Sequence, residues 1–289
     1  MHYLVIVSVI WAFSFGIVGN RLAGVDPNWI ATLRSLLALI LFLPFLRWQG
    51  VVSARTAGPL FLCGAIQFGL MYLFLFAAFA YLPSHQVALF SILTPIYVYA
   101  LSDLQRRCFS KRFLLAAILS IIGALVIRMQ SMGWDAQILT GFLLLQGANL
   151  SFAAGQVYYR NWKLAHPEQS EQHHFAILFT GAFTLSLLWT ISTKGWAPLA
   201  EINSEQWPYI LYLGLVASGI GFFWWNKGAS RVTPGALAAS NNAVVPLAVF
   251  ISLFIFGEIG LLDAQSIMRL AIGSILIALA MVIGSQKAK

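Results

Sequence analysis

Residues 80–95, AYLPSHQVALFSILTP, decide the fold because a variant of this stretch recurs in the second half of the chain. Residues 231–246, RVTPGALAASNNAVVP, carry two prolines at the same positions, 151 residues further on (234 − 83 and 246 − 95). Downstream, IIGAL at 121–125 is echoed by AIGSI at 271–275. The repeated spacing predicts a chain built from two related halves.

The composition around these stretches indicates a membrane protein. Hydrophobic residues make up 60% of the 289 positions and charged residues only 9%, against about 25% charged residues in a soluble domain. A large soluble core would account for the apolar residues but not for the shortage of polar cover. At roughly 20 residues per spanning helix, the length accommodates about ten spans and argues against an additional globular domain.

Continuous apolar runs predict an all-α integral membrane protein. Helices satisfy every backbone N–H group within hydrocarbon, and the runs lack the alternation of a membrane β-barrel. The predicted helices span 3–21, 28–46, 57–80, 84–101, 112–128, 137–160, 173–192, 207–229, 235–256 and 265–285.

The Lys and Arg residues orient these helices. With the N-terminus inside, most cations of the short connections also fall inside, among them Arg106, Arg107, Lys111 and Arg112. The positive-inside rule therefore predicts that both termini lie in the cytoplasm of a cell with a bacterial inner membrane, and it favours an even number of spans. The net charge of +8 reflects this topology and gives no reason to expect nucleic-acid binding.

The two repeats, 1–130 and 137–289, would each contain five helices. Because five is an odd number, the second copy would enter the membrane upside down relative to the first. An inverted repeat around a site at the midplane is the architecture of alternating-access carriers. A membrane scaffold would have no use for such a duplication with paired prolines.

Individual motifs point to a known family. Two five-helix halves, with Trp11 in the first helix and FGE at 256–258 near the end of the ninth, resemble the drug/metabolite transporter superfamily, EamA family. The resemblance covers the whole chain. It implies two inverted five-helix repeats, a cavity between the halves, no bound cofactor and no ATPase. The sequence also contains no phosphate-binding Gly-x-x-x-x-Gly-Lys-Ser/Thr motif.

A narrower resemblance concerns the substrate. Five stretches are similar to the biotin importers of that family: IWAFSF at 10–15, LFLPFLR at 41–47, LTPIY at 93–97, VASGIGF at 216–222 and NN at 241–242. What the resemblance implies is biotin uptake by a secondary transporter.

Polar residues within the sixth predicted helix mark a candidate cavity wall. Gln146, Asn149, Ala153 and Gln156 follow one another in steps of three, four and three, so they share one face of a helix. Uncharged amides in a membrane either contact a ligand or make hydrogen bonds between helices. Both interpretations remain open from the residues alone.

Two adjacent amides in the ninth predicted helix are further candidates. Asn241 and Asn242 precede Pro246 by five and four residues, and adjacent helical residues point about 100° apart, so at most one faces the centre squarely. They could bind a planar polar group or satisfy the backbone that the proline frees. Pro95 and Pro246 are candidate gating positions.

Aromatic residues and one glutamine complete the candidate substrate contacts. An apolar ring or alkyl chain could pack on an aromatic side chain, and a Tyr hydroxyl adds a polar group, although aromatic residues in membrane proteins mostly serve packing. The candidates are Trp11, Gln67, Tyr72, Tyr97 and Trp225.

Three charged residues are of interest because charges are scarce. Arg34 lies within the second predicted helix, where an arginine is a functional candidate or snorkels to the interface. We expect a structural or gating role for it. Lys227, at the inner end of the eighth helix, could attract a carboxylate or anchor the helix. Glu258 could couple proton influx to transport or cap a helix.

The sequence therefore predicts an alternating-access transporter of a small metabolite, as a monomer or homodimer, with biotin uptake implied by resemblance. An exporter of amino acids or related metabolites is the nearest alternative, because topology does not fix direction. An integral membrane enzyme acting on lipid is a third class. It would need a catalytic constellation or a set of metal ligands, and the sequence shows neither.

Overall fold

The computed structural model describes residues 1–22, 24–47, 54–82, 86–87, 90–128, 136–254 and 264–286. Within these ranges the chain is helical. Its α-helices are α1 (His2–Arg21), α2 (Pro27–Phe42), α3 (Ala54–Gly64), α4 (Met71–Ala78), α6 (Thr94–Arg106), α7 (Lys111–Arg128), α8 (Ala136–Ala165), α9 (Phe175–Lys194), α10 (Ala197–Ala200), α11 (Trp207–Leu211), α12 (Gly221–Ala229), α13 (Pro234–Ser240), α14 (Val244–Phe254) and α15 (Ala264–Ser285).

Short segments of other geometry join some of these helices. Two π-helices, η2 (Ala65–Leu70) and η5 (Tyr212–Ile220), connect α3 to α4 and α11 to α12 into continuous rods. The 3₁₀-helices are η1 (Leu43–Phe45), η3 (Ser91–Leu93) and η4 (Glu171–His173). Insertions of π-helix are rare and are frequently found at functional sites.

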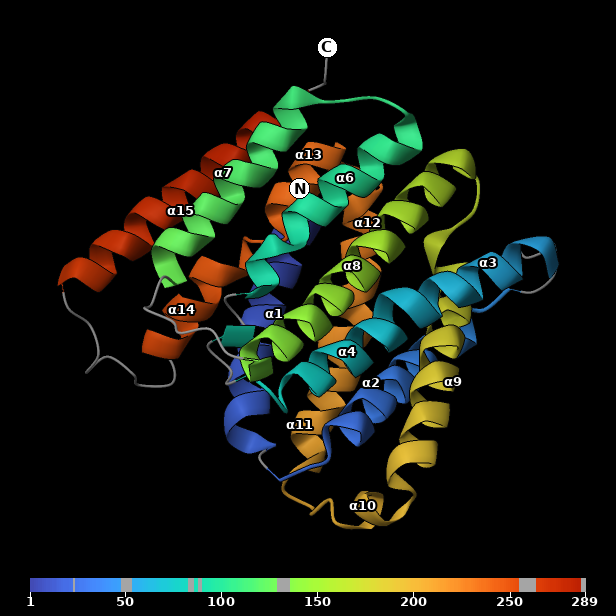
Figure 1. Ribbon diagram of the computed structural model, residues 1–289. Helices are drawn as coiled ribbons and strands as arrows, with labels where there is room; N and C mark the ends of the chain where they lie inside the picture. Colours follow the sequence, from blue (N-terminus) through green and yellow to red (C-terminus); the bar gives the residue numbers. More distant parts are fainter. Residues whose placement is uncertain are drawn as a thin grey trace.

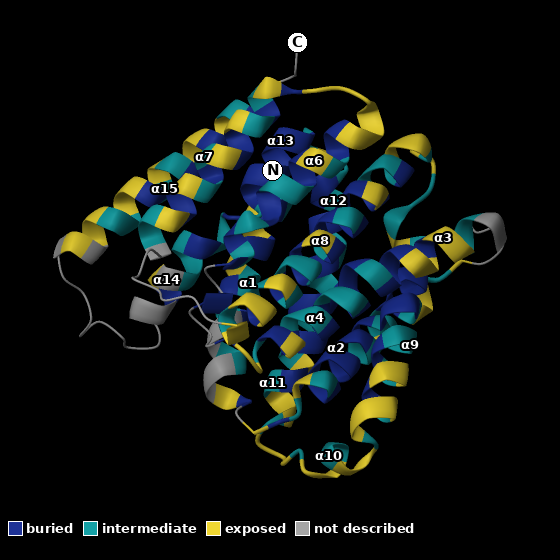
Figure 2. Ribbon diagram, viewed as in Figure 1, coloured by how far each residue is buried: buried dark blue, intermediate teal, exposed yellow. Residues whose placement is uncertain are grey.

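Six helices among the described residues are long and apolar enough to cross a membrane. They span 27–45, 56–78, 136–165, 175–194, 207–229 and 267–285. The outward faces carry exposed apolar side chains, for example Leu115, Leu188 and Ile275 (Figure 2). A surface of this kind requires lipid as its surroundings, so the predicted membrane-protein class is confirmed.

Proline and side-chain caps set where two of the helices begin. Asp26 precedes Pro27, and its Oδ1 accepts hydrogen bonds from the backbone N–H groups of Asn28 and Trp29 at 2.9 and 3.1 Å. Thr233 precedes Pro234, and its hydroxyl accepts from the N–H group of Ala236. Proline suits the first helical position because the backbone N–H group that it lacks would have no partner within the helix there.

The ends of the described chain lie at the same end of the bundle, beside the connection between α12 and α13 (Figure 1). The Tyr3 ring lies 6.3 Å from that of Trp224, and the Thr233 hydroxyl donates to the Gly284 carbonyl. We call this end the terminal end. The opposite end, which carries α10, we call the distal end.

Helices α7 and α15 pack side by side along one flank of the bundle (Figure 1). They are in close contact at Gly123 and Gly273, where a Cβ atom on Gly273 would lie only 2.4 Å from the Gly123 carbonyl oxygen. Small residues let membrane helices approach this closely. The sequence echo between 121–125 and 271–275 thus corresponds to a direct contact.

Two interrupted helices meet near the middle of the bundle. Residues 91–93 form a 3₁₀ turn before Pro95, and residues 241–243 form a turn before Pro246. Proline cannot donate a backbone hydrogen bond, which weakens the helix in the preceding turn. The Asn242 side chain donates to the Ile92 carbonyl at 3.0 Å, so the two interruptions are held against each other.

Candidate functional site

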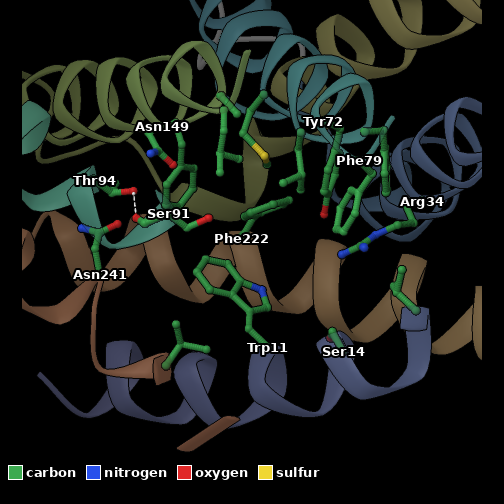
Figure 3. A pocket seen from close by; sticks show the side chains of 18 residues that line it. Trp11, Ser14, Arg34, Tyr72, Phe79, Ser91, Thr94, Asn149, Phe222 and Asn241 are labelled. Atoms are coloured by element: carbon green, nitrogen blue, oxygen red, sulfur yellow. Dashed lines mark hydrogen bonds between the residues drawn. The ribbon is translucent and has the colours of Figure 1, made fainter. Parts of the chain in front are cut away.

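A cavity of about 190 Å³ lies where these elements surround the centre of the bundle. Figure 3 shows that its polar side chains gather at two ends, with aromatic rings between them. The lining residues come from α1, α2, α4, η3, α6, α8, α12 and the α13–α14 region: Trp11, Ser14, Val18, Arg34, Met71, Tyr72, Leu75, Phe76, Phe79, Ser91, Thr94, Leu145, Ala148, Asn149, Phe152, Phe222, Asn241 and Val244.

Arg34 dominates one end of the cavity. Its side chain is only 6% exposed, and its Nε donates to the Ser218 hydroxyl at 2.9 Å. The guanidinium carbon lies 4.6 Å from the centre of the Tyr72 ring, and the hydroxyls of Tyr72 and Ser218 are 3.2 Å apart. Arg34 is therefore held rigidly by α2, α4 and η5.

The charge of Arg34 has no acidic partner in the described part of the chain. The ion pairs found there join Lys194 to Asp26 and Arg231 to Glu171. A guanidinium has five N–H donors, and a buried charge needs a partner or strong hydrogen bonds. This end of the cavity can thus receive an anion.

Amides and hydroxyls form the other end. Asn149 donates from Nδ2 to the Phe90 carbonyl at 3.0 Å and to Gln146 Oε1 at 3.1 Å. Asn241 exchanges hydrogen bonds with the Gln156 amide at 3.3 and 3.5 Å. The Thr94 hydroxyl donates to the Ser91 carbonyl at 2.8 Å. Because these donors are engaged within the protein, this end offers a ligand uncharged oxygen acceptors.

Aromatic rings separate the two polar ends. The Trp11 indole donates to the Ala217 carbonyl at 2.9 Å, which fixes its ring in the cavity. Phe152 and Phe222 lie edge-on to Trp11, with ring centres 5.8 and 5.4 Å away. These surfaces suit an apolar group positioned between two polar ones.

Five of the residues singled out from the sequence line this cavity: Trp11, Arg34, Tyr72, Asn149 and Asn241. Two more support its amide end from behind. Gln146 accepts hydrogen bonds from Asn149 and from the Tyr97 hydroxyl, the latter at 3.2 Å.

The other described residues singled out from the sequence lie outside the lining. The Trp225 ring is tilted by 32° against that of Trp11, with ring centres 4.8 Å apart, and its indole N–H donates to Gln156 Oε1. Gln67 exchanges hydrogen bonds with the Asn226 amide at 3.0 and 3.3 Å.

Asn242 donates instead to the Ile92 carbonyl between the two interrupted helices. Lys227 lies near the terminal end, with Nζ 5.6 and 5.5 Å from the rings of Tyr3 and Phe223. Pro95 and Pro246 lie within the first turns of α6 and α14. Glu258 falls outside the described residues.

The sequence reading missed Ser218 as the partner of Arg34. One signal was present, because Ser218 follows Gln67 at the repeat distance of 151 (218 − 67) and both are polar residues in apolar runs. Both lie in the two π-helices. Ser91 and Thr94 were also missed, since small hydroxyl residues are common in helices of this kind.

The described residues provide no group of three or more His, Cys, Asp or Glu side chains that could hold a metal ion. The polar and aromatic groups that line the cavity are a guanidinium, amides, hydroxyls and aromatic rings. Such a set can bind and orient a small molecule through hydrogen bonds and packing.

Apolar helices of membrane-spanning length around a cavity with polar ends define a polytopic membrane transporter. Comparison with known proteins agrees: residues 1–129 match the EamA-like transporter family. A "Probable biotin transporter" of Pseudomonas aeruginosa is 40% identical over 281 residues, covering 96% of this chain and 94% of its own. The chain belongs to the EamA-like transporter family.

Two further comparisons cover most of the chain. A "Biotin transporter" of Escherichia coli (strain K12) is 38% identical over 262 residues, covering 89% of this chain and 85% of its own. A solved crystal structure with 18% sequence identity covers 99% of this chain and 94% of that one, with a TM-score of 0.75. The latter likeness supports the fold alone.

Proposed function

We propose that the protein is a secondary transporter that takes up biotin by alternating access, with the substrate bound in the central cavity. Relatives named as biotin transporters, at 37–40% identity over most of the chain, support this substrate. The observation that carries the proposal is the division of the cavity into a cationic end, an aromatic middle and an amide end.

Biotin has the matching chemistry. Its carboxylate lies at the end of an alkyl chain, and its planar ureido ring lies at the other end of the molecule. Arg34 would bind the carboxylate, since guanidinium and carboxylate groups form charge-assisted hydrogen bonds. The side-chain oxygens of Asn149 and Asn241 would accept hydrogen bonds from the ureido N–H groups, because their own N–H groups already donate within the protein. Trp11 would pack against the apolar part.

This assignment gives the carboxylate to Arg34 and not to Lys227, which the sequence had suggested as a candidate. The Lys227 ammonium lies against aromatic rings near the terminal end and not in the cavity lining. It would serve as an interfacial anchor. Arg34 would take the substrate-binding role instead of a purely structural one.

The proposed topology has about ten spans in two inverted repeats, with both termini in the cytoplasm of a bacterium. The matching positions of the two π-helices support the repeat, since residues 216–220 of η5 are the counterparts of 65–69 in η2 at a distance of 151 residues. The two helix interruptions before Pro95 and Pro246 support it as well. Cations at the terminal end support the orientation.

In that orientation the structure corresponds to a state closed toward the cytoplasm. Leu4, Val7, Val98, Trp225 and Leu237 pack into one buried cluster between Trp11 and the terminal end. Transport would require this cluster to separate while the distal end closes. The halves would then rock about the bound substrate.

The experiment is uptake of radiolabelled biotin, at low nanomolar concentration, into a biotin-auxotrophic strain that lacks its own importer. Saturable uptake that excess unlabelled biotin abolishes would support both substrate and direction. Absent uptake, with the protein present in the membrane, would contradict the biotin assignment, and export of amino acids would be tested next.

A further inference from the structure

A second cavity, of about 530 Å³, lies at the terminal end and shares no lining residue with the first. Three arginines surround it, one at the end of α6, one in the last turns of α8 and one in the connection from α12 to α13. The lining residues are Arg106, Phe113, Arg160, Ser230, Arg231, Val232, Thr233 and Pro234.

Arg160 is held in place by the protein. Its Nε and Nη2 donate to the Val232 carbonyl at 3.2 and 3.0 Å, and its Nη1 donates to the Asn161 amide oxygen at 3.2 Å. A guanidinium has five N–H donors, so Arg160 retains donors for a ligand. Its position is fixed without any ligand, as a preformed site requires.

The other two arginines approach from separate elements. The guanidinium carbon of Arg106 lies 5.6 Å from the Phe113 ring centre, and that of Arg231 lies 5.3 Å from the Tyr3 ring centre. Arg231 pairs with Glu171 at 3.7 Å while its side chain is 49% exposed, which makes that pair weak. In the described part of the chain, no carboxylate pairs with Arg106 or Arg160.

Convergence of three cations on one cavity is unfavourable unless an anion neutralises them. The positive-inside rule accounts for cations at this end, but it does not require three of them to line one cavity. The Ser230 and Thr233 hydroxyls and the Phe113 ring complete the lining. This combination of guanidinium groups, hydroxyls and an apolar ring fits a phosphate group attached to lipid.

We propose that this cavity binds the phosphate group of an anionic phospholipid in the cytoplasmic leaflet. Basic pockets between membrane helices on the cytoplasmic side are known binding sites for anionic headgroups. The choice of leaflet rests on the proposed topology, whereas the phosphate chemistry rests on the three arginines. Inorganic phosphate has the same recognition chemistry, and the experiment separates the two sources.

The site also joins the two halves of the chain. Arg106 and Phe113 belong to the first half, and Arg160 and Arg231 to the second. A bound phosphate would therefore bridge the halves at the terminal end. Occupancy would favour the state that is closed there, because opening would separate the arginines.

The test is thermal unfolding of the full-length protein in phosphatidylcholine bicelles, with and without phosphatidylglycerol, and separately with inorganic phosphate. The double variant Arg106→Gln/Arg231→Gln removes two cations and leaves the Arg160 contact to Val232 intact. Arg47→Gln is the matched control, since Arg47 is an exposed arginine near the same end that does not line the cavity.

Phosphatidylglycerol is expected to raise the Tm of the wild type and of the control by about 3 °C or more. The double variant should lose this shift while its Tm in pure phosphatidylcholine stays close to that of the control. An equal lipid shift in all three proteins would overturn the proposal. A shift produced by inorganic phosphate and not by the lipid would overturn the lipid as the source.

These results are independent of the biotin assignment. Biotin at saturating concentration is expected to raise the Tm of the double variant as it does that of the wild type. A double variant that failed to fold would lose the response to biotin as well as the response to lipid. In that case the single variant Arg106→Gln would be measured in its place. That variant must reduce the lipid shift while its Tm in pure phosphatidylcholine stays close to that of the control, or the proposal fails.

Discussion

At the scale of single residues, Arg34 should decide which substrates are accepted. Replacing Arg34 with Gln is expected to raise the apparent KM for biotin roughly ten- to hundredfold, because a charge-assisted hydrogen bond of about 1.5–3 kcal/mol is lost. Competition with biotin methyl ester, which has no carboxylate charge, measures the effect directly. The ester should compete weakly in the wild type and as well as biotin in the variant.

Lys227→Gln is the matched control for that experiment. Lys227 is a cation in a spanning helix that does not line the cavity, so its variant should keep the wild-type preference for biotin over the ester. Unchanged discrimination in Arg34→Gln, or its loss in Lys227→Gln, would contradict the assignment. A purely structural role of Arg34 would reduce transport without altering the preference.

The two adjacent asparagines should behave differently. Asn241→Ala removes an amide from the cavity wall and is expected to raise the KM for biotin several-fold with little loss of stability. Asn242→Ala leaves the Ile92 carbonyl without its side-chain donor and should lower the free energy of unfolding by about 1–3 kcal/mol. Uptake kinetics and thermal unfolding of both variants test this, and identical profiles would count against it.

His174 should make stability depend on pH. It lies just before α9, is fully buried, and its Nε2 is 3.1 Å from the Tyr159 hydroxyl. Burial, with the nearby Lys163 charge as a smaller cause, lowers its pKa from 6.5 to about 3. The folded protein thus keeps it neutral at pH values where the unfolded chain binds a proton.

Above about pH 6.5 the histidine is neutral in both states and its burial costs no deprotonation. As the pH falls from 6.5 toward 3, the unfolded chain is favoured by its bound proton, and the free energy of unfolding falls by up to about 1.4 kcal/mol per pH unit. When the pH is lowered from 7 to 5, the Tm of the wild type should therefore fall by more than the Tm of the His174→Gln variant. Equal losses in the two proteins would show that other groups cause the decline.

Sequence reasoning found residue types more readily than residue roles. Trp11, Asn149 and Asn241 were identified because polar and aromatic residues are conspicuous in apolar runs. The roles of Arg34 and Lys227 could not be distinguished, because the choice depends on which helix face each occupies and on how the helices rotate. Ser218 holds Arg34 across 184 residues of sequence, and no local pattern predicts such a contact.

At the scale of helices, the contact between α7 and α15 depends on glycine. Gly123→Leu is expected to destabilise the protein by several kcal/mol, because the new side chain would collide with the backbone of Gly273. Gly58→Leu is the control, since Gly58 is an exposed helical glycine with open space beside it. The midpoint of thermal unfolding should fall in the first variant and stay nearly constant in the second.

Apolar runs predicted the positions of the helices well but not their internal geometry. The expected span 207–229 agrees with the α11–η5–α12 rod, and 57–80 agrees with the α3–η2–α4 rod within a few residues. The π-helices within both rods were not predicted, because π-helix adds a residue to a turn without a sequence signature of its own. The helices expected at 84–101 and 235–256 are interrupted at 91–93 and 241–243. Pro246 suggested the second interruption, whereas the first was not predicted.

At the scale of the whole molecule, the central cavity and the basic cavity occupy different levels of the bundle. The first surrounds Trp11 at the centre of the bundle (Figure 3), and the second lies at the terminal end between α6, α8 and the α12–α13 connection. The buried cluster around Trp225 lies between the central cavity and the cations of the terminal end. Movement of the two proposed halves relative to each other would alter both cavities together.

The two cysteines provide a test of the orientation and of the state of the cavity. Cys108 is exposed in the connection between α6 and α7 at the terminal end, whereas Cys63 is buried. A membrane-impermeant maleimide should label Cys108 in inside-out vesicles and not in intact cells. Labelling from outside the cell would contradict cytoplasmic termini.

In a Cys63→Ser/Cys108→Ser background, Ala148→Cys would report on the cavity, because Ala148 lines it. Alanine is small and apolar, so its replacement by cysteine changes the lining little. If the cavity is reached from the distal side, the reagent should label this cysteine in intact spheroplasts, and biotin should slow the labelling. Protection requires substrate in the cavity, so unprotected labelling would argue against binding there. Labelling confined to inside-out vesicles would instead indicate that the predominant state in the membrane opens toward the terminal end, opposite to the arrangement of the buried cluster around Trp225.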